Sequence, residues 1–227
     1  MSTGVTPIDY HGDLLVVFGA AQDFVIETPT DTSEDAPSET SADTSFATPT
    51  TSEADDESTI RNGGESIELR FLCSCRQMER GSKRLARDLF PARNPGRWAV
   101  TKDFPPMPLT MVLTIIHGKT RYIPDIVSPA VLADVASIVE YLECHDALDF
   151  FGRNWLSRYT EINELPTSMD EELVQLIHIS FTFDNKAIFE QSTETAIRHS
   201  PGDVPTYDLP IQEDVLSKFV FPPLPNI

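Results

Sequence analysis

The sequence predicts an α+β fold in which a small β-sheet, made of a hairpin plus short strands, is covered by a bundle of α-helices.

 

Strand-like segments are few and lie near the amino end of the chain, whereas the rest reads as amphipathic helices joined by short turns. The chain has 227 residues, of which 40% are hydrophobic, so it can bury a sizeable core.

Two segments predict the sheet. Residues 13–19, DLLVVFG, form an apolar run that ends at a glycine. Residues 66–73, SIELRFLC, alternate apolar with charged side chains, as a strand with one buried face does. We expect the two segments to pair as a hairpin with a large loop, because the entropy of loop closure grows only logarithmically with loop length.

The loop between these segments is acidic. From Asp23 to Glu65 the chain has twelve acidic residues and one basic residue, Arg61. We predict that about residues 27–64 are disordered, because a segment with so few apolar side chains cannot offset the entropy of ordering. Several hydroxyl residues here precede an acidic residue by three positions, a spacing that suits acidophilic kinases and is frequent by chance in such a composition. They include Thr28, Thr32, Thr50 and Ser52.

Helical periodicity begins after this strand pair. Residues 75–90, CRQMERGSKRLARDLF, place apolar side chains at helical spacing before Pro91, which predicts one helix. Residues 97–104 predict a short strand. The next helix is predicted to end at Gly118. Its apolar face consists of Leu109, Val112, Leu113 and Ile116.

Three further helices are predicted before the C-terminal region. Ser128 and Pro129 open the first of them as N-cap and first helical residue, and a second follows at residues 145–159. The buried stripe of the first comprises Val131, Leu132, Val135, Ile138, Val139 and Leu142. Ser168 and Glu171 form a capping box that predicts the start of the third.

Residues 186–199 predict the last helix, followed by Ser200, Pro201 and Gly202, which end it.

The turn His117-Gly118-Lys119 has two interpretations. It could be a phosphate-binding or general-base site, but the glycines of a phosphate loop and an orienting carboxylate are both missing nearby. The favoured interpretation is structural: Gly118 adopts the left-handed conformation that ends the helix, and a cationic His117 or Lys119 interacts with the helix dipole.

The charge of the chain restricts its partners. A formal net charge of -19 disfavours nucleic acid and anionic membranes, and no apolar run is long enough to span a bilayer. One basic cluster stands out, with a local net charge of +5. It comprises Arg76, Arg80, Lys83, Arg84, Arg87, Arg93 and Arg97, against Glu79 and Asp88. The cluster is either a solvated helix face, which we favour, or a site for an acidic partner.

The three cysteines, Cys73, Cys75 and Cys144, accompany an amino end without the pattern of a signal peptide, which predicts an intracellular protein of the cytoplasm or nucleus. Together with His145 they could supply four zinc ligands. The C-x-C spacing differs from the usual C-x2-C, and buried cysteines are common without any ligand role, so we favour core packing and predict no metal site.

Motifs of catalysis and cofactor binding are missing from the sequence. It contains no G-x-S-x-G, no H-E-x-x-H, no dinucleotide fingerprint and no P-loop. The five histidines, at positions 11, 117, 145, 178 and 199, share no recurrent spacing. We therefore predict no catalytic residue, no cofactor-binding residue and no enzymatic activity.

Residues 109–155, LTMVLTIIHGKTRYIPDIVSPAVLADVASIVEYLECHDALDFFGRNW, resemble the BTB/POZ domain in the form common among fungal proteins. The shared features are an apolar helix, a His-Gly turn, a short extended segment and a helix with a Tyr-x-x-Cys element, here Tyr141 to Cys144. Residues 13–19 resemble the first strand of that family, and residues 69–90 its second strand and following helix, with Ser82 and Leu89 at the family spacing. Residues 171–200 are similar to the helical extension of these fungal proteins.

The resemblance implies a BTB/POZ-like domain at residues 10–160, interrupted by the acidic insert, and a C-terminal helical extension at residues 161–227. It also implies a non-catalytic protein–protein interaction module whose partner is a protein, either a second copy in a homodimer or another chain. The alternative is a substrate adaptor for a cullin-type ubiquitin ligase. Residues 90–98, FPARNPGRW, lack the hydrophobic-x-Glu element that cullin-recruiting relatives often carry, which argues against the adaptor.

Overall fold

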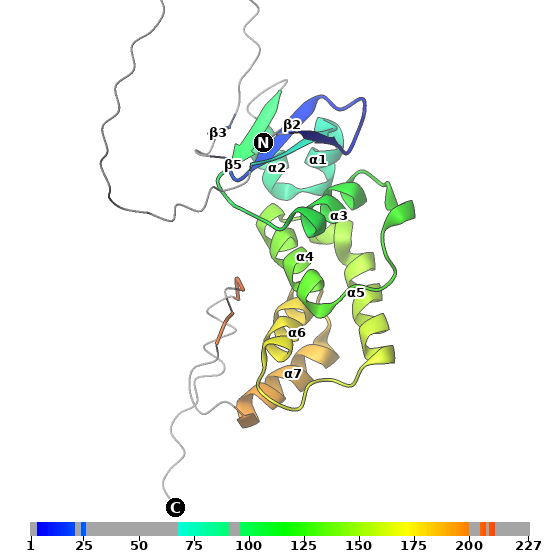
Figure 1. Ribbon diagram of the computed structural model, residues 1–227, viewed down its shortest axis with the longest axis vertical. Helices are drawn as coiled ribbons and strands as arrows, with labels where there is room; N and C mark the ends of the chain where they lie inside the picture. The colour runs from blue at the N-terminus through cyan, green and yellow to red at the C-terminus, as the bar shows by residue number, and fades with distance from the viewer. Residues whose placement is uncertain are drawn as a thin grey trace, which may run out of the picture.

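Among the described residues, four strands come first, followed by two short helices, a fifth strand and then helices alone (Figure 1). The computed structural model describes residues 4–20, 24–25, 68–90, 96–199, 205–207 and 209–211. The described strands are β1 (Val5–Pro7), β2 (Leu14–Phe18), β3 (Phe24–Val25), β4 (Leu69–Cys73) and β5 (Arg97–Val100). The described helices are α1 (Cys75–Gly81), α2 (Lys83–Leu89), α3 (Pro106–Ile116), the 3-10 helix η1 (Thr120–Tyr122), α4 (Pro129–Leu142), α5 (His145–Ile162), α6 (Glu171–Thr182) and α7 (Lys186–His199).

The strands form one mixed sheet with the order β1-β4-β2-β5-β3. The predicted pairing of β2 with β4 is confirmed: the strands are antiparallel, with Leu14 opposite Cys73 and Phe18 opposite Leu69. The short strand β5 is also confirmed and runs parallel to β2. The edge strands β1 and β3 were not predicted, so the sheet is wider than a hairpin with one short strand.

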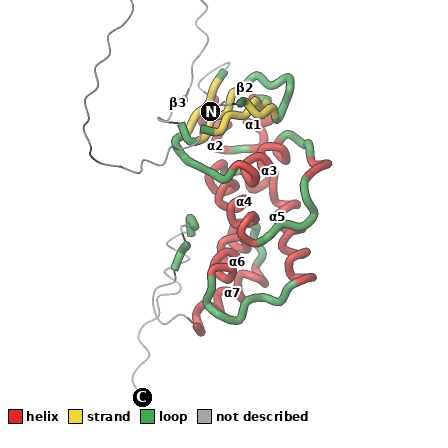
Figure 2. Tube along the Cα trace, in the orientation of Figure 1, coloured by secondary structure: helices red, strands yellow, loops and turns green. Residues whose placement is uncertain are grey.

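The helices extend away from the sheet, which lies at one end of the molecule (Figure 2). Val16, Phe18 and Trp98 are fully buried and belong to the main core, together with residues from α1 to α7. Val17 and Ala99 alternate with them along the strands and form a separate small cluster. The α+β class predicted from the sequence is therefore confirmed.

The prediction of one helix at residues 75–90 is wrong, because the helix is interrupted at Ser82 and forms the two helices α1 and α2. Ser82 is extended, with φ -131° and ψ 117°, and it serves as the C-cap of α1 and the N-cap of α2. Its hydroxyl oxygen accepts a hydrogen bond from the Leu85 N–H at 3.0 Å. Gly81 precedes the break, and a Cβ at this position would lie 2.6 Å from the Ile116 side chain, so glycine allows α1 to approach α3.

The predicted C-terminal end of α3 and the predicted N-terminal start of α4 are both confirmed. Gly118 has φ +68°, and its N–H donates to the Ile115 carbonyl oxygen at 2.8 Å just beyond the end of α3. Ser128 is the N-cap of α4 and Pro129 its first residue. The Ser128 hydroxyl oxygen accepts from the Val131 N–H at 3.4 Å.

The capping box predicted at Ser168 is wrong, because Asp170 is the N-cap of α6. The Asp170 carboxylate accepts from the Leu173 N–H at 2.9 Å, and the Ser168 hydroxyl donates to that same carboxylate at 3.1 Å. A carboxylate two residues later competes successfully for the free N–H groups of the first turn. Leu176 and Ile179 of α6 belong to the main core that also includes α4.

The predicted disorder of residues 27–64 falls outside the described residues, and so do the hydroxyl residues Thr28, Thr32, Thr50 and Ser52. Ser200, Pro201 and Gly202, predicted to end the last helix, also lie outside them.

Candidate interaction surface

His117 fixes the turn after α3 by two hydrogen bonds. Its Nδ1–H donates to the Leu113 carbonyl oxygen at 2.7 Å, and its Nε2 accepts from the Ser74 N–H at 2.9 Å. A backbone N–H can only donate, so Nε2 carries a lone pair and the imidazole is neutral. Burial lowers the pKa of His117, consistent with this state. The predicted cationic role is therefore wrong for His117, which joins α3 to the start of α1.

Lys119 supplies the positive charge of this turn. Its Nζ donates to the Ile8 carbonyl oxygen at 2.6 Å and lies 3.6 Å from the Asp9 carboxylate. The turn is thus tied to the segment between β1 and β2, more than 100 residues away in the sequence. These contacts support the structural interpretation of His117-Gly118-Lys119.

The segment from η1 to α4 is also tied to α5. The Trp155 indole Nε1–H donates to the Pro124 carbonyl oxygen at 2.8 Å. Ile123 and Val127 pack against the main core on either side of this bond. The Trp155 ring in turn lies 5.7 Å from the ring of Phe151, which is also packed on the core.

Large apolar side chains are exposed on these two connected segments. Tyr122 is 86% exposed, Ile126 59% and Phe150 73%. We call Tyr122, Ile126 and Phe150 the loop–α5 surface. Exposed aromatic and aliphatic side chains on a fixed backbone are typical anchors of protein interfaces, because little ordering entropy is lost on binding.

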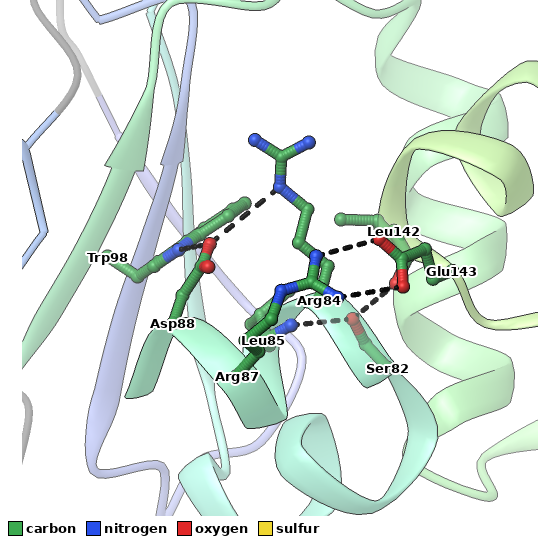
Figure 3. A network of polar contacts seen from close by, with 8 residues as sticks. All are labelled: Ser82, Arg84, Leu85, Arg87, Asp88, Trp98, Leu142 and Glu143. Atoms are coloured by element: carbon green, nitrogen blue, oxygen red, sulfur yellow. Dashed lines mark hydrogen bonds and ion pairs between the residues drawn. The ribbon is translucent and has the colours of Figure 1, made fainter. Parts of the chain in front are cut away.

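The basic cluster near α2 is engaged within the molecule (Figure 3). Arg87 makes two hydrogen bonds to the Glu143 carboxylate, at 2.7 and 3.1 Å. The Arg84 guanidinium lies 4.0 Å from the centre of the Tyr141 ring and 3.7 Å, measured from Nε, from Asp88. These contacts favour the interpretation of the cluster as a helix face over a site for an acidic partner.

Other members of the cluster differ in their contacts. Lys83 pairs with Asp146 at 3.4 Å and Arg97 with Glu68 at 3.6 Å. Arg76 and Arg80 form no ion pair within the described part of the chain. Arg93 lies outside it.

The four residues considered as zinc ligands lie in different parts of the fold. Cys73 is in β4, Cys75 begins α1, and Cys144 precedes His145 at the start of α5. Burial raises the pKa of the Cys73 and Cys144 thiols to about 12 and that of Cys75 to about 11, so all three are protonated near neutral pH. Among the described residues, no group of three or more His, Cys, Asp or Glu side chains could hold a metal ion.

A set of partly buried polar contacts between α4, α5 and α6 was not predicted from the sequence. The Ser137 hydroxyl donates to the Ala133 carbonyl oxygen at 2.9 Å and lies 3.2 Å from His178 Nε2, which therefore donates to it. The His145 Nε2 lies 3.2 Å from the Glu140 carboxylate. The signal in the sequence is His178, a titratable residue that stands between Ile177 and Ile179 in α6.

A shallow hollow of about 640 Å³ lies along α7. It is lined by Thr167, Ala187, Glu190, Gln191, Glu194, Thr195, Arg198 and His199. Glu194 and Arg198 pair with each other, as do Glu190 and Lys186, so the charges of this wall are largely satisfied by their own helix.

No family model, no curated protein and no solved structure matches the chain. No described helix combines the length and the apolar character needed to cross a membrane.

Proposed function

We propose that this chain is a non-catalytic protein–protein interaction module with a BTB/POZ-like architecture of the fungal type. The order of elements supports the proposal: a strand pair, two short helices, a parallel strand and then antiparallel helices with a His-Gly turn after α3. The helices α6 and α7 follow in the position of the extension that the resemblance implies.

One observation carries the proposal, namely the exposure of the loop–α5 surface, whose loop segment is held by a side-chain hydrogen bond from α5. The bond from Trp155 to the Pro124 carbonyl oxygen fixes the segment that carries Tyr122 and Ile126. Apolar side chains that remain exposed on a fixed segment lower the entropic cost of binding a partner. The partner we propose is a protein, either another chain or a second copy.

The site of action we propose is the cytoplasm or nucleus. The three cysteines are unpaired, which suits a reducing compartment. The net charge of -19 supports a protein partner over nucleic acid or an anionic membrane.

The test compares the full chain with a variant that carries Tyr122→Ser and Phe150→Ser. Both chains are purified with an affinity tag from the source cell, and co-purified proteins are quantified by mass spectrometry. Self-association is measured in parallel by light scattering. We expect the variant to lose the partner, or the self-association, by about tenfold or more, because anchor residues dominate binding energy.

Phe90→Ser is the matched control, because Phe90 is also 86% exposed but lies at the end of α2. The control is expected to retain the partner, and all three proteins are expected to unfold at the same temperature. Equal recovery by the wild type and the double variant would contradict the proposal.

A further inference from the structure

Ile211 attaches the chain beyond α7 to the last two helices. It packs against a buried contact of α6 with α7, which Leu173, Ile177 and Ala196 form. The Ile211 N–H donates to the Leu209 carbonyl oxygen at 2.8 Å, and Leu209 packs against the main core. The point from which the chain continues after Ile211 is therefore fixed next to α6 and α7.

Partly exposed apolar side chains lie beside this point. Phe189 of α7 packs against the same cluster as Ile211 and is only partly buried. The Phe181 ring lies 5.9 Å from the Phe189 ring, and Phe181 is 39% exposed. Ile197 stands eight positions after Phe189, in the same row of side chains along α7, and is 37% exposed. We call Phe181, Phe189 and Ile197 the extension face.

The sequence becomes apolar shortly after Ile211. Residues 215–221, VLSKFVF, lie outside the described residues and contain five large apolar side chains among seven. These are Val215, Leu216, Phe219, Val220 and Phe221. The removal of apolar side chains from water is favourable, and folded proteins rarely leave a large contiguous apolar surface exposed. A run of this composition is therefore suited to cover another apolar surface.

The short connection to Ile211 determines which surface the run can reach. Three residues, 212–214, separate Ile211 from Val215. A chain spans at most about 3.3–3.6 Å per residue, so Val215 lies within about 14 Å of Ile211. The extension face adjoins the cluster that Ile211 contacts, and it is therefore within reach. Because the tether is short, the effective concentration of the run at this face is high.

We propose that residues 215–221 of this chain dock on the extension face and cover Phe181, Phe189 and Ile197. The apolar composition of the run matches the apolar side chains of the face, and the contact at Ile211 holds the two close together. Docking would connect the segment beyond α7 to both helices at more places than Ile211. The extension face is separate from the loop–α5 surface, and the proposal does not depend on the function proposed there.

Trypsin cleavage after Lys218 tests the proposal, because Lys218 lies within the run and is the only Lys or Arg after Arg198. The full chain is treated with dilute trypsin, and mass spectrometry follows the release of residues 219–227. The comparison is with Phe181→Ser combined with Ile197→Ser, which leaves the sequence of the run unchanged. We expect this variant to release the peptide at least about tenfold faster than the wild type, because cleavage follows the population of the undocked segment.

Phe90→Ser is the matched control, since it removes an apolar side chain that is 86% exposed at the end of α2. The control is expected to release the peptide at the wild-type rate. Thermal unfolding verifies that each variant is folded, and Phe181→Ser alone carries the comparison if the double variant does not fold. Equal release by the wild type and the folded face variant would overturn the proposal. Protection of the wild type that disappears on dilution would also overturn it, because a second copy would then be the occupant.

Discussion

The Ser82 hydroxyl donates a hydrogen bond to the Leu142 carbonyl oxygen at 2.6 Å, and this contact joins the break between α1 and α2 to the last turn of α4 (Figure 3). Glu143 follows with φ 52°, and its carbonyl oxygen accepts from the Lys83 N–H at 3.2 Å. The polar groups at the junction of α1 and α2 thus form hydrogen bonds with the carbonyl groups at the end of α4. The Arg87 pair with the Glu143 carboxylate lies at the exposed side of the same junction.

Ser82→Ala is expected to lower the free energy of unfolding by about 1–3 kcal/mol, because it leaves the buried Leu142 carbonyl oxygen and the Leu85 N–H without their partner. Urea denaturation measures the change. Ser157→Ala, at an exposed position on α5, is the control and should stay within about 0.5 kcal/mol of the wild type. An unchanged stability of Ser82→Ala would show that the junction is not held by this hydroxyl.

Gly118→Ala is expected to destabilise the protein by about 1–2 kcal/mol. A Cβ at this position would meet no atom within 4 Å, so the cost arises from the left-handed φ of +68° alone. Gly96→Ala is the matched control: the space around it is equally open, and Gly96 has no positive φ. Thermal unfolding that ranks the two variants equally would contradict the backbone explanation.

The sequence predicts those elements whose signal is local. The helices α4, α5 and α7 follow the periodicity of an apolar face, which is readable without the rest of the chain. The helix α3 was predicted from the same pattern, but it is buried on nearly all sides from Pro108 onward. The pairing of β2 with β4 was also predictable, because each strand carries its own apolar pattern.

Other features depend on contacts that are distant in the sequence. The interruption at Ser82 is stabilised by the hydrogen bond from the Ser82 hydroxyl to the Leu142 carbonyl oxygen. Nothing between residues 75 and 90 indicates that partner. The neutral state of His117 depends on Ser74, 43 residues earlier. The strands β1 and β3, of three and two residues, are too short to show an alternating pattern. The loop–α5 surface was not predicted, since exposure of Tyr122 and Phe150 follows from how α5 packs.

Gly152→Ala is expected to destabilise the protein by about 1–3 kcal/mol through overpacking. Gly152 is buried in α5, and a Cβ there would overlap the ring of Phe183, which is 2% exposed at the end of α6. The double variant with Phe183→Leu is expected to be more stable than the sum of the two single effects predicts, because the smaller side chain leaves room for the methyl group. Strict additivity in urea denaturation would contradict this contact.

His178 is expected to make the protein less stable as the pH falls from 6.5 towards 4. Burial lowers the pKa of His178 from its ordinary value of 6.5 to about 4. In this range the unfolded chain binds a proton that the folded protein does not, so the stabilisation is complete above pH 6.5 and is lost on acidification. The loss from this group amounts to at most about 3 kcal/mol.

His178→Gln tests this explanation, because glutamine can still donate to the Ser137 hydroxyl but cannot titrate. Its unfolding free energy is expected to vary less steeply between pH 6.5 and 4 than that of the wild type. His145→Gln is expected to act in a different pH range. Glu140 raises the pKa of His145, so His145 stabilises the fold fully below pH 6.5 and loses this effect as the pH rises through its folded pKa, and the variant is expected to change the pH dependence of stability above pH 6.5. If His178→Gln kept the wild-type slope between pH 6.5 and 4, the acid sensitivity would arise elsewhere than at His178.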